Sequence, residues 1–194
     1  APIGPNETAV PFDDCVSAIM PHRTPSERRP LEIKVRGMHF KDSDESYWTL
    51  QPQTLRHGVA KNVRGRFESG DIRHLSIFGL APIPLLMELG RLVSDISDVD
   101  VYERHREPPQ WKWPEDGPEV NFSRTKGQIG PKKVALKLSV TSQIADERVT
   151  DVMGEDVSIW DISSDPQAHG VIRRKSDLSR YRSIVRATLD EIKN

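Results

Sequence analysis

A buried strand that runs directly into a helix constrains this chain more than any other feature. The segment Ile72 to Leu80 is apolar on both faces near its end, which is typical of a central strand in a parallel sheet. It continues through Gly-Leu-Ala-Pro-Ile-Pro (79–84) into a helical pattern from Pro84 to Val93, and proline suits a first helical turn. Because parallel strands need crossover connections, the sequence predicts an α/β fold.

Further strands and helices are predicted on both sides of this segment. An apolar period of two indicates a strand, and recurrence every three to four residues indicates an amphipathic helix. The strands are predicted at 31–36, 46–50, 72–80, 99–102, 133–140 and 157–162, and the helices at 54–68, 84–93 and 178–192. The order of strand, short strand and basic-faced helix occurs twice, which predicts a pseudo-repeat of two lobes.

The domain organisation follows from this repeat. Residues 1–30 contain six prolines, a composition that favours extended backbone, so they are interpreted as a linker from an upstream domain. The first lobe is predicted at 31–118 and the second at 119–194. Since the chain stops just after the helix that matches 54–68, we expect the second lobe to be truncated and to lack its central strand.

Composition argues against several classes of protein. The 194 residues include 28 Lys and Arg and 29 Asp and Glu, so the net charge of -1 gives no overall electrostatic reason to bind duplex nucleic acid. The lone Cys15 excludes a disulfide framework and a four-cysteine zinc site. With no export signal and no apolar window of about 18 residues, a cytoplasmic protein without a membrane segment is expected.

The turn between the buried strand and the helix is the first candidate ligand site. Ligands of open α/β sheets bind at the carboxyl ends of the strands, where helix N-termini offer free backbone amides to phosphate. We expect such amides from Ile83 and Leu85. An ordinary strand-to-helix turn fits the pattern equally well. The candidate residues here are Phe78, Leu80, Ala81, Pro82, Ile83 and Pro84.

The loop Tyr102 to Trp113 is the second candidate. It combines cations, which meet phosphate, with tryptophans, whose rings stack on bases at about 1–3 kcal/mol each. The alternative is that both tryptophans anchor the loop onto the body of the domain. The candidate residues are Tyr102, Arg104, His105, Arg106, Trp111 and Trp113.

Two further regions have weaker signals. The strand end at 139–143 offers the hydroxyls of Ser139, Thr141 and Ser142 and the amide of Gln143, although hydroxyl-rich strand ends are common. Basic runs at 56–73 and 173–186 fit either a nucleic-acid patch or, more often, the solvated face of an amphipathic helix. A DNA-binding module therefore stays open as an alternative.

The sequence predicts no catalytic residue, no metal site and no cofactor. The six histidines show no H-E-x-x-H spacing, and no G-x-S-x-G elbow, P-loop or Rossmann glycine fingerprint is present. An α/β enzyme that uses a nucleotide cofactor remains an alternative. Detectable turnover or bound nicotinamide would favour it.

Three motifs resemble the SAVED domain, the cyclic-oligonucleotide sensor of bacterial CBASS anti-phage effectors, especially the type fused behind an HNH nuclease. They are Ile-Arg-His-Leu-Ser-Ile-Phe-Gly-Leu-Ala-Pro-Ile-Pro-Leu-Leu-Met-Glu-Leu-Gly (72–90), Val-Asp-Val-Tyr-Glu-Arg-His-Arg (99–106) and Trp-Lys-Trp-Pro (111–114). The resemblance is close over 30–114 and continues more weakly over 120–194.

This resemblance implies two fused CARF-like Rossmannoid lobes with mainly parallel sheets, which hold a cyclic nucleotide second messenger across the crevice between them. The expected ligand is a cyclic dinucleotide such as 3′,2′-cyclic GMP-AMP. Ligand binding is expected to drive self-association and to activate an attached endonuclease, with residues 1–30 as its tether. No nuclease motif is present, so DNA is expected to be a partner only of the attached nuclease.

Overall fold

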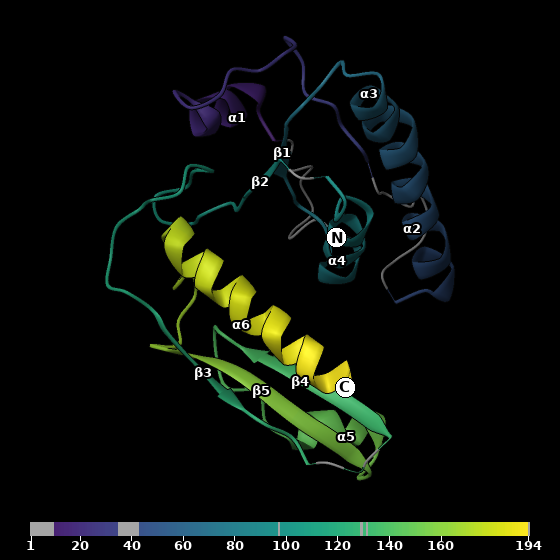
Figure 1. The fold of residues 1–194 in the computed structure, drawn as a ribbon, viewed down its shortest axis with the longest axis vertical. Helices are drawn as coiled ribbons and strands as arrows, with labels where there is room; N and C mark the ends of the chain where they lie inside the picture. Colours follow the sequence, from purple (N-terminus) through teal and green to yellow (C-terminus); the bar gives the residue numbers. More distant parts are fainter. Residues whose placement is uncertain (1–9, 35–42, 97, 129, 131, 194) are drawn as a thin grey trace. The chain divides into compact units, whose positions relative to one another are not determined.

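The computed structural model describes residues 10–34, 43–96, 98–128, 130 and 132–193. The chain divides into two compact units, Ala1–Lys112 and Trp113–Asn194. The boundary expected from the sequence, after residue 118, falls inside unit 2. Each unit contains helices and a small sheet, so the fold is mixed α/β (Figure 1). In the described part of the chain, no helix combines the length and the hydropathy that a membrane crossing requires.

Unit 1 is built around a two-stranded parallel sheet. Strand β1 (Leu75–Phe78) pairs with β2 (Val99–Tyr102), and helix α4 (Ile83–Leu92) connects them. The predicted helix 84–93 and strand 99–102 are confirmed within one residue. The predicted strand 72–80 is confirmed only at its centre, because the pairing ends at Phe78. The other elements of the unit are α1 (Phe12–Ile19), α2 (Glu45–Val59), a π-helical turn (Ala60–Arg64) and α3 (Gly65–Glu68).

One long helical segment, formed by α2, the π-helical turn and α3, covers one face of this sheet. Its buried residues recur every four positions, a spacing that drifts by about 40° per step around an α-helix of 3.6 residues per turn. The wider π-helical turn offsets this drift and keeps the later residues facing the sheet. This core consists of Leu55, Val59, Val63 and Val93, with Ile33, Phe67, Leu75, Ile77, Leu89, Leu92 and Ile96 packed against it.

The strand predicted at 46–50 is wrong, because these residues form the first turns of α2. Tyr47, Trp48 and Thr49 favour strands, and Pro52 is unusual inside a helix. Tyr47 nevertheless begins the buried series with a spacing of four, and its burial outweighs local propensity. Residues 31–34 of the other predicted strand have no regular structure, and residues 35 and 36 lie outside the described residues.

Helix α1 lies in the segment for which the composition favours extended backbone. The expectation is wrong for Phe12–Ile19, where Cys15, Ala18 and Ile19 form a buried face. Prolines border this helix without entering it: Pro11 is its N-cap, and Pro21 follows its C-cap. Burial of an apolar face therefore stabilises a helix that proline content alone argues against.

Unit 2 contains a three-stranded mixed sheet in the order β3-β5-β4. Strand β4 (Lys133–Ser139) is parallel to β5 (Val157–Asp165), and β3 (Asn121–Thr125) is antiparallel to β5. Helix α6 (Lys175–Lys193) runs along one face of the sheet (Figure 1), where Tyr181 contacts Phe122 at a ring-centroid distance of 5.3 Å. Helix α5 (Glu147–Met153) contacts β5.

The sequence located β4, β5 and α6 in unit 2, which confirms those predictions, but it missed β3 and α5. Because β3 is antiparallel, this sheet is mixed, and the expectation of mainly parallel sheets is wrong for unit 2. The pseudo-repeat is also wrong: in the described residues of unit 1, the positions of its two strands hold irregular backbone and part of α2.

Candidate functional site

Aromatic side chains gather at the carboxyl ends of β1 and β2. Phe78 and Tyr102 are the last residues of the two strands and are partners in register. Their rings stack with centroids 4.6 Å apart and planes 10° apart, and Trp111 meets Phe78 edge-on at 5.4 Å and 80°. Burial raises the pKa of Tyr102, and the nearby Asp100 carboxylate adds to this effect. The structure thus brings three predicted residues together at the expected edge of the sheet.

The two tryptophans are buried, as the anchoring alternative predicts. Trp111 is only 1% exposed, and within the described residues its Nε1 has no hydrogen-bond partner. Trp113 is 6% exposed and belongs to unit 2. A ring that is covered on both sides leaves no face for a base in this conformation. The role predicted for Trp111 in stacking a ligand is therefore weaker than its role in fixing the loop.

Arg104 is held on the aromatic cluster but stays accessible. Its guanidinium carbon lies 5.9 Å from the centroid of the Trp111 ring, and Nη1 donates to Oδ2 of Asp14 at 3.3 Å. The side chain is 37% exposed. Since an arginine has five N–H donors, this geometry orients the guanidinium and leaves donors for an anion. Helix α1, which carries Asp14, therefore contributes to the site.

A backbone hydrogen bond closes the rest of the loop. The His105 amide donates to the carbonyl of Gln110 at 2.8 Å, and the His105 side chain is buried. Arg106 is exposed. Of the three predicted cationic residues, Arg104 and Arg106 therefore reach the surface, whereas His105 lies inside the loop.

At the strand-to-helix turn, apolar side chains are exposed, whereas one of the two expected backbone amides is already hydrogen-bonded. Pro82 is the N-cap of α4, and its carbonyl accepts a hydrogen bond from the Leu85 amide at 2.9 Å. The amide expected from Leu85 is therefore already used inside the helix. The side chains of Leu80 and Ile83 are 44% and 69% exposed. Gly79 lets the turn pass close to α4, because a Cβ there would lie 2.9 Å from Cδ2 of Leu86.

A polar row on the second face of the same sheet was missed from the sequence. His74 Nδ1 lies 2.9 Å from Oδ1 of Asp98, and its Nε2 lies 3.0 Å from Oγ of Ser76. Arg23 reaches Asp98 from the N-terminal segment at 3.0 Å. His74 and Arg23 together lower the pKa of Asp98. The alternation of polar and apolar residues at 74–77 and 98–101 is the sequence signal for this row.

In unit 2, the predicted hydroxyls divide into one structural residue and two accessible ones. Ser139 is fully buried, and its Oγ donates to Oδ1 of Asp161 at 2.7 Å. Thr141 and Ser142 are exposed. Two exposed glutamines lie beside them: Gln143, which belongs to the predicted strand end, and Gln167, which the sequence analysis did not select. Gln167 donates to the Ser139 carbonyl at 3.0 Å.

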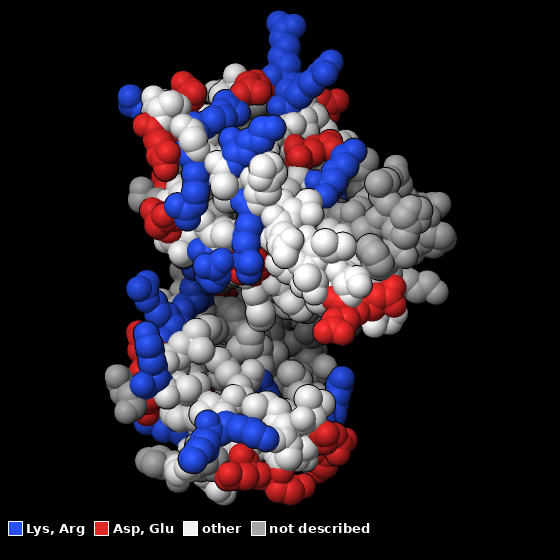
Figure 2. All heavy atoms as spheres, turned by 90° about the vertical axis from the view of Figure 1, so that its right-hand side faces the viewer, with Lys and Arg blue, Asp and Glu red and all other residues white. Residues whose placement is uncertain are grey.

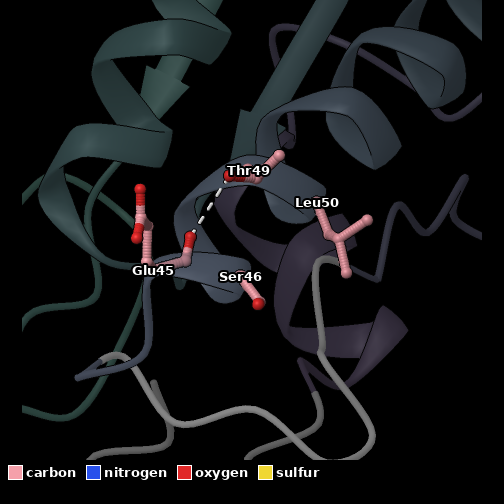
Figure 3. A pocket seen from close by; sticks show the side chains of 4 residues that line it. All are labelled: Glu45, Ser46, Thr49 and Leu50. Carbon is pink, nitrogen blue, oxygen red and sulfur yellow. Dashed lines mark hydrogen bonds between the residues drawn. The ribbon is translucent and has the colours of Figure 1, made fainter.

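None of these residues lines either of two surface hollows. One, of about 310 Å³, lies at the start of α2 and is lined by Glu45, Ser46, Thr49 and Leu50 (Figure 3). Its polar groups are partly satisfied, since Oγ1 of Thr49 donates to the Glu45 carbonyl at 3.3 Å. The other, of about 530 Å³, includes Ile72 and Arg73, which precede β1. That position is the amino end of the strand, whereas ligands of open α/β sheets bind at the carboxyl end.

In the described part of the chain, no three His, Cys, Asp or Glu side chains come together in a group that could hold an ion.

The comparison with protein families assigns the chain. The model of the SMODS-associated and fused to various effectors sensor domain, SAVED, matches residues 55–194. The chain belongs to the SAVED family. SAVED domains are sensors that bind cyclic oligonucleotides and occur in effector fusions, so this chain is a sensor domain. The match spans both strand-end regions described above. Among curated proteins, none matches the sequence.

Proposed function

We propose that this SAVED domain senses a cyclic dinucleotide, such as 3′,2′-cyclic GMP-AMP, with the strand-end loops of unit 1. The observation that carries the proposal is Arg104, which is fixed between Trp111 and Asp14 at the carboxyl edge of the parallel sheet and stays accessible. The match to a family of cyclic-oligonucleotide sensors supplies the class of ligand.

The chemistry of such a ligand fits the exposed side chains of this edge. A cyclic dinucleotide has two phosphates and two bases, so it needs cations and apolar surface together. Arg104 and Arg106 offer cations, and Leu80 and Ile83 offer exposed apolar groups for the face of a base. Ala81 and Pro84 complete the apolar side of the proposed surface.

The buried aromatic residues have a positioning role in this proposal. Phe78, Tyr102 and Trp111 form a packed aromatic layer, and Arg104 lies over its Trp111 ring. Because their side chains are ordered before the ligand arrives, less conformational entropy is lost on binding.

We further propose that ligand binding drives self-association and activates a DNA endonuclease fused to this domain. The description of the family as fused to various effectors supports an attached effector. The sensor itself needs no contact with DNA in this account, since the nuclease would supply it.

Direct binding of duplex DNA has less support. Three arginines of the basic run 56–73 are paired with carboxylates: Arg56 with Glu88 at 2.6 Å, Arg64 with Asp95 at 2.9 Å, and Arg66 with Glu27. Figure 2 shows Asp and Glu side chains among the Lys and Arg side chains on the side of unit 1 that carries α2 and α3. A face whose cations are already neutralised releases fewer counterions on binding DNA.

Calorimetric titration with 3′,2′-cyclic GMP-AMP tests the site. We expect Arg104→Ala to weaken binding by about tenfold or more, because a hydrogen bond to a charged group contributes about 1.5–3 kcal/mol. The matched control is Arg182→Ala, an exposed arginine on α6, which should bind like the wild type. Equal affinities of the Arg104 and Arg182 variants would reject this placement of the site.

The same samples test self-association. Size-exclusion chromatography with light scattering should show a larger species after the ligand is added to the wild type. A mass that stays constant at saturating ligand would contradict this part of the proposal.

A further inference from the structure

Ion pairs tie the N-terminal segment to several other elements of unit 1. They include Asp14–Arg104, Arg23–Asp98 and Glu27–Arg66. Of these three pairs, only the first uses Arg104, the cation that is proposed to meet the ligand. In this pair, Oδ2 of Asp14 accepts a hydrogen bond from Nη1 of Arg104 at 3.3 Å. Helix α1 and a bound phosphate would therefore share one guanidinium.

The pair between Asp14 and Arg104 is weaker than a phosphate contact of the same guanidinium. Its distance of 3.3 Å is long for a charge-assisted hydrogen bond, and the two side chains are 46% and 37% exposed. Exposed ion pairs contribute little to stability, because water screens them. A phosphate accepts two parallel N–H bonds from an arginine, which is a stronger arrangement. The phosphate is thus the stronger of the two anions at this position.

Both anions at Arg104 would also repel each other. A phosphate within hydrogen-bonding reach of the guanidinium would lie close to the Asp14 carboxylate, and like charges at short range are unfavourable. Trp111 is uncharged, and its ring centroid lies 5.9 Å from the guanidinium carbon. The ring therefore keeps Arg104 oriented when Asp14 leaves.

Displacement of Asp14 loosens α1 without unfolding it. The helix keeps its buried face of Cys15, Ala18 and Ile19, and Nη2 of Arg23 keeps its bonds to both carboxylate oxygens of Asp98 at 3.0 and 3.2 Å. The first turns of α1 nevertheless lose their tie to the loop after β2. Segments with fewer contacts open locally more often. Because Cys15 is only 8% exposed, the rate at which its thiol becomes accessible reports on this tie.

We propose that Asp14 is an internal competitor for the ligand: it occupies Arg104 in the free sensor, and ligand binding displaces it and loosens α1. The inference rests on the proposed function, because it assumes that a phosphate of the ligand binds Arg104. It adds a regulatory contact, through which occupation of the strand-end site affects the N-terminal segment of the same unit.

Calorimetric titration of Asp14→Asn and Asp13→Asn with 3′,2′-cyclic GMP-AMP tests the competition. Asp13 is exposed on the same helix, so each variant removes one negative charge from the same turn. Loss of the competitor should make Asp14→Asn bind about two- to fivefold more tightly than Asp13→Asn, a range that corresponds to an exposed ion pair. A residue that only positions Arg104 would give weaker binding when it is replaced. Equal or weaker binding by Asp14→Asn would overturn the proposal.

The reactivity of Cys15 tests the loosening of α1. Cys15 is the only cysteine of the chain, so N-ethylmaleimide, an uncharged thiol reagent, reports on this helix alone. Without ligand, Arg104→Gln should react about two- to fivefold faster than the wild type, whereas Arg182→Gln on α6 should react like the wild type. Saturating ligand should accelerate the wild type by a similar factor. An unchanged rate in Arg104→Gln, or in the wild type with ligand, would contradict the proposal.

The outcomes separate this inference from the proposed function. If the wild type does not bind 3′,2′-cyclic GMP-AMP, both proposals fail. If the wild type binds it and Arg104→Ala weakens binding, but Asp14→Asn binds no more tightly than Asp13→Asn, the displaceable contact is wrong and cyclic-dinucleotide sensing stands. The same conclusion follows if bound ligand leaves the reactivity of Cys15 unchanged.

Discussion

The two units stabilise the carboxyl ends of their strands in different ways. In unit 1 the stacked rings of Phe78 and Tyr102, with Trp111 against them, close the edge of the sheet. In unit 2 the corresponding edge is closed by Lys137 and Asp161, whose strands place them in register. The strand ends of unit 1 therefore depend on burial of apolar surface, and those of unit 2 depend on charge and hydrogen bonds.

This difference decides which cation is accessible. Aromatic packing orients a single cation, Arg104, toward solvent, which suits the binding of phosphate. In unit 2 the polar network buries its cation, because the Lys137 side chain is only 8% exposed. The comparison therefore favours unit 1 for the proposed recognition of phosphate.

The largest expected effect comes from removing the aromatic layer. Trp111→Ala should lower the free energy of unfolding by about 3–5 kcal/mol, because a fully buried indole leaves a large cavity. Urea denaturation measures the change. Trp48→Ala is the control, since Trp48 is 37% exposed, and it should cost about 1 kcal/mol. Similar losses for the two variants would show that Trp111 does not hold the edge of unit 1.

A smaller effect is expected from the network of unit 2. Lys137→Met should destabilise the protein by about 1–3 kcal/mol, because Asp161 loses a cation while it keeps its bond from Ser139. The same urea titration applies, with Lys132→Met as the exposed control. A Lys137 variant as stable as the control would mean that the network does not support the loop that follows β4.

The smallest effect concerns acid stability at α4. Hydrogen bonds from Arg91 and then Arg56 lower the pKa of Glu88 from 4.5 to about 2. A folded-state pKa below the unfolded value means that the ionised group stabilises the fold above pH 4.5, and that this contribution is lost as the pH falls toward 2. Glu88→Gln should therefore reduce the loss of stability on acidification in this window.

Thermal denaturation measured between pH 5 and pH 2 detects this difference in stability. Glu68→Gln is the control, as Glu68 is exposed and has no ion-pair partner among the described residues. If the Glu88→Gln variant loses as much thermal stability on acidification as the wild type does, Arg56 and Arg91 do not stabilise the fold through the ionised Glu88.

The sequence was most informative where periodicity and burial agree. The strand–turn–helix at 75–92 and the strands β4 and β5 follow directly from their apolar patterns. At α1 and at 46–50 local composition was misleading, because burial of Cys15 and Tyr47 decides the structure there. Strand β3 has little apolar content and exists through its pairing with β5.

The sequence predicted where the candidate site lies better than it predicted what its residues do. Placing loops at the carboxyl ends of parallel strands is a consequence of topology, so the edge was predictable. The burial of Trp111 depends on Phe78, 33 positions earlier, and no local pattern contains it. Gln167 likewise reaches Ser139 and Gln143 only through the fold.

Hydrogen–deuterium exchange with and without saturating 3′,2′-cyclic GMP-AMP is the most direct test of the central claim, that the strand-end loops bind the ligand. We predict slower exchange of the amides of residues 79–81, 83 and 103–106 in unit 1, with no change along the basic face of α2. Protection of the α2 face, or no protection of the strand-end loops, would contradict the account.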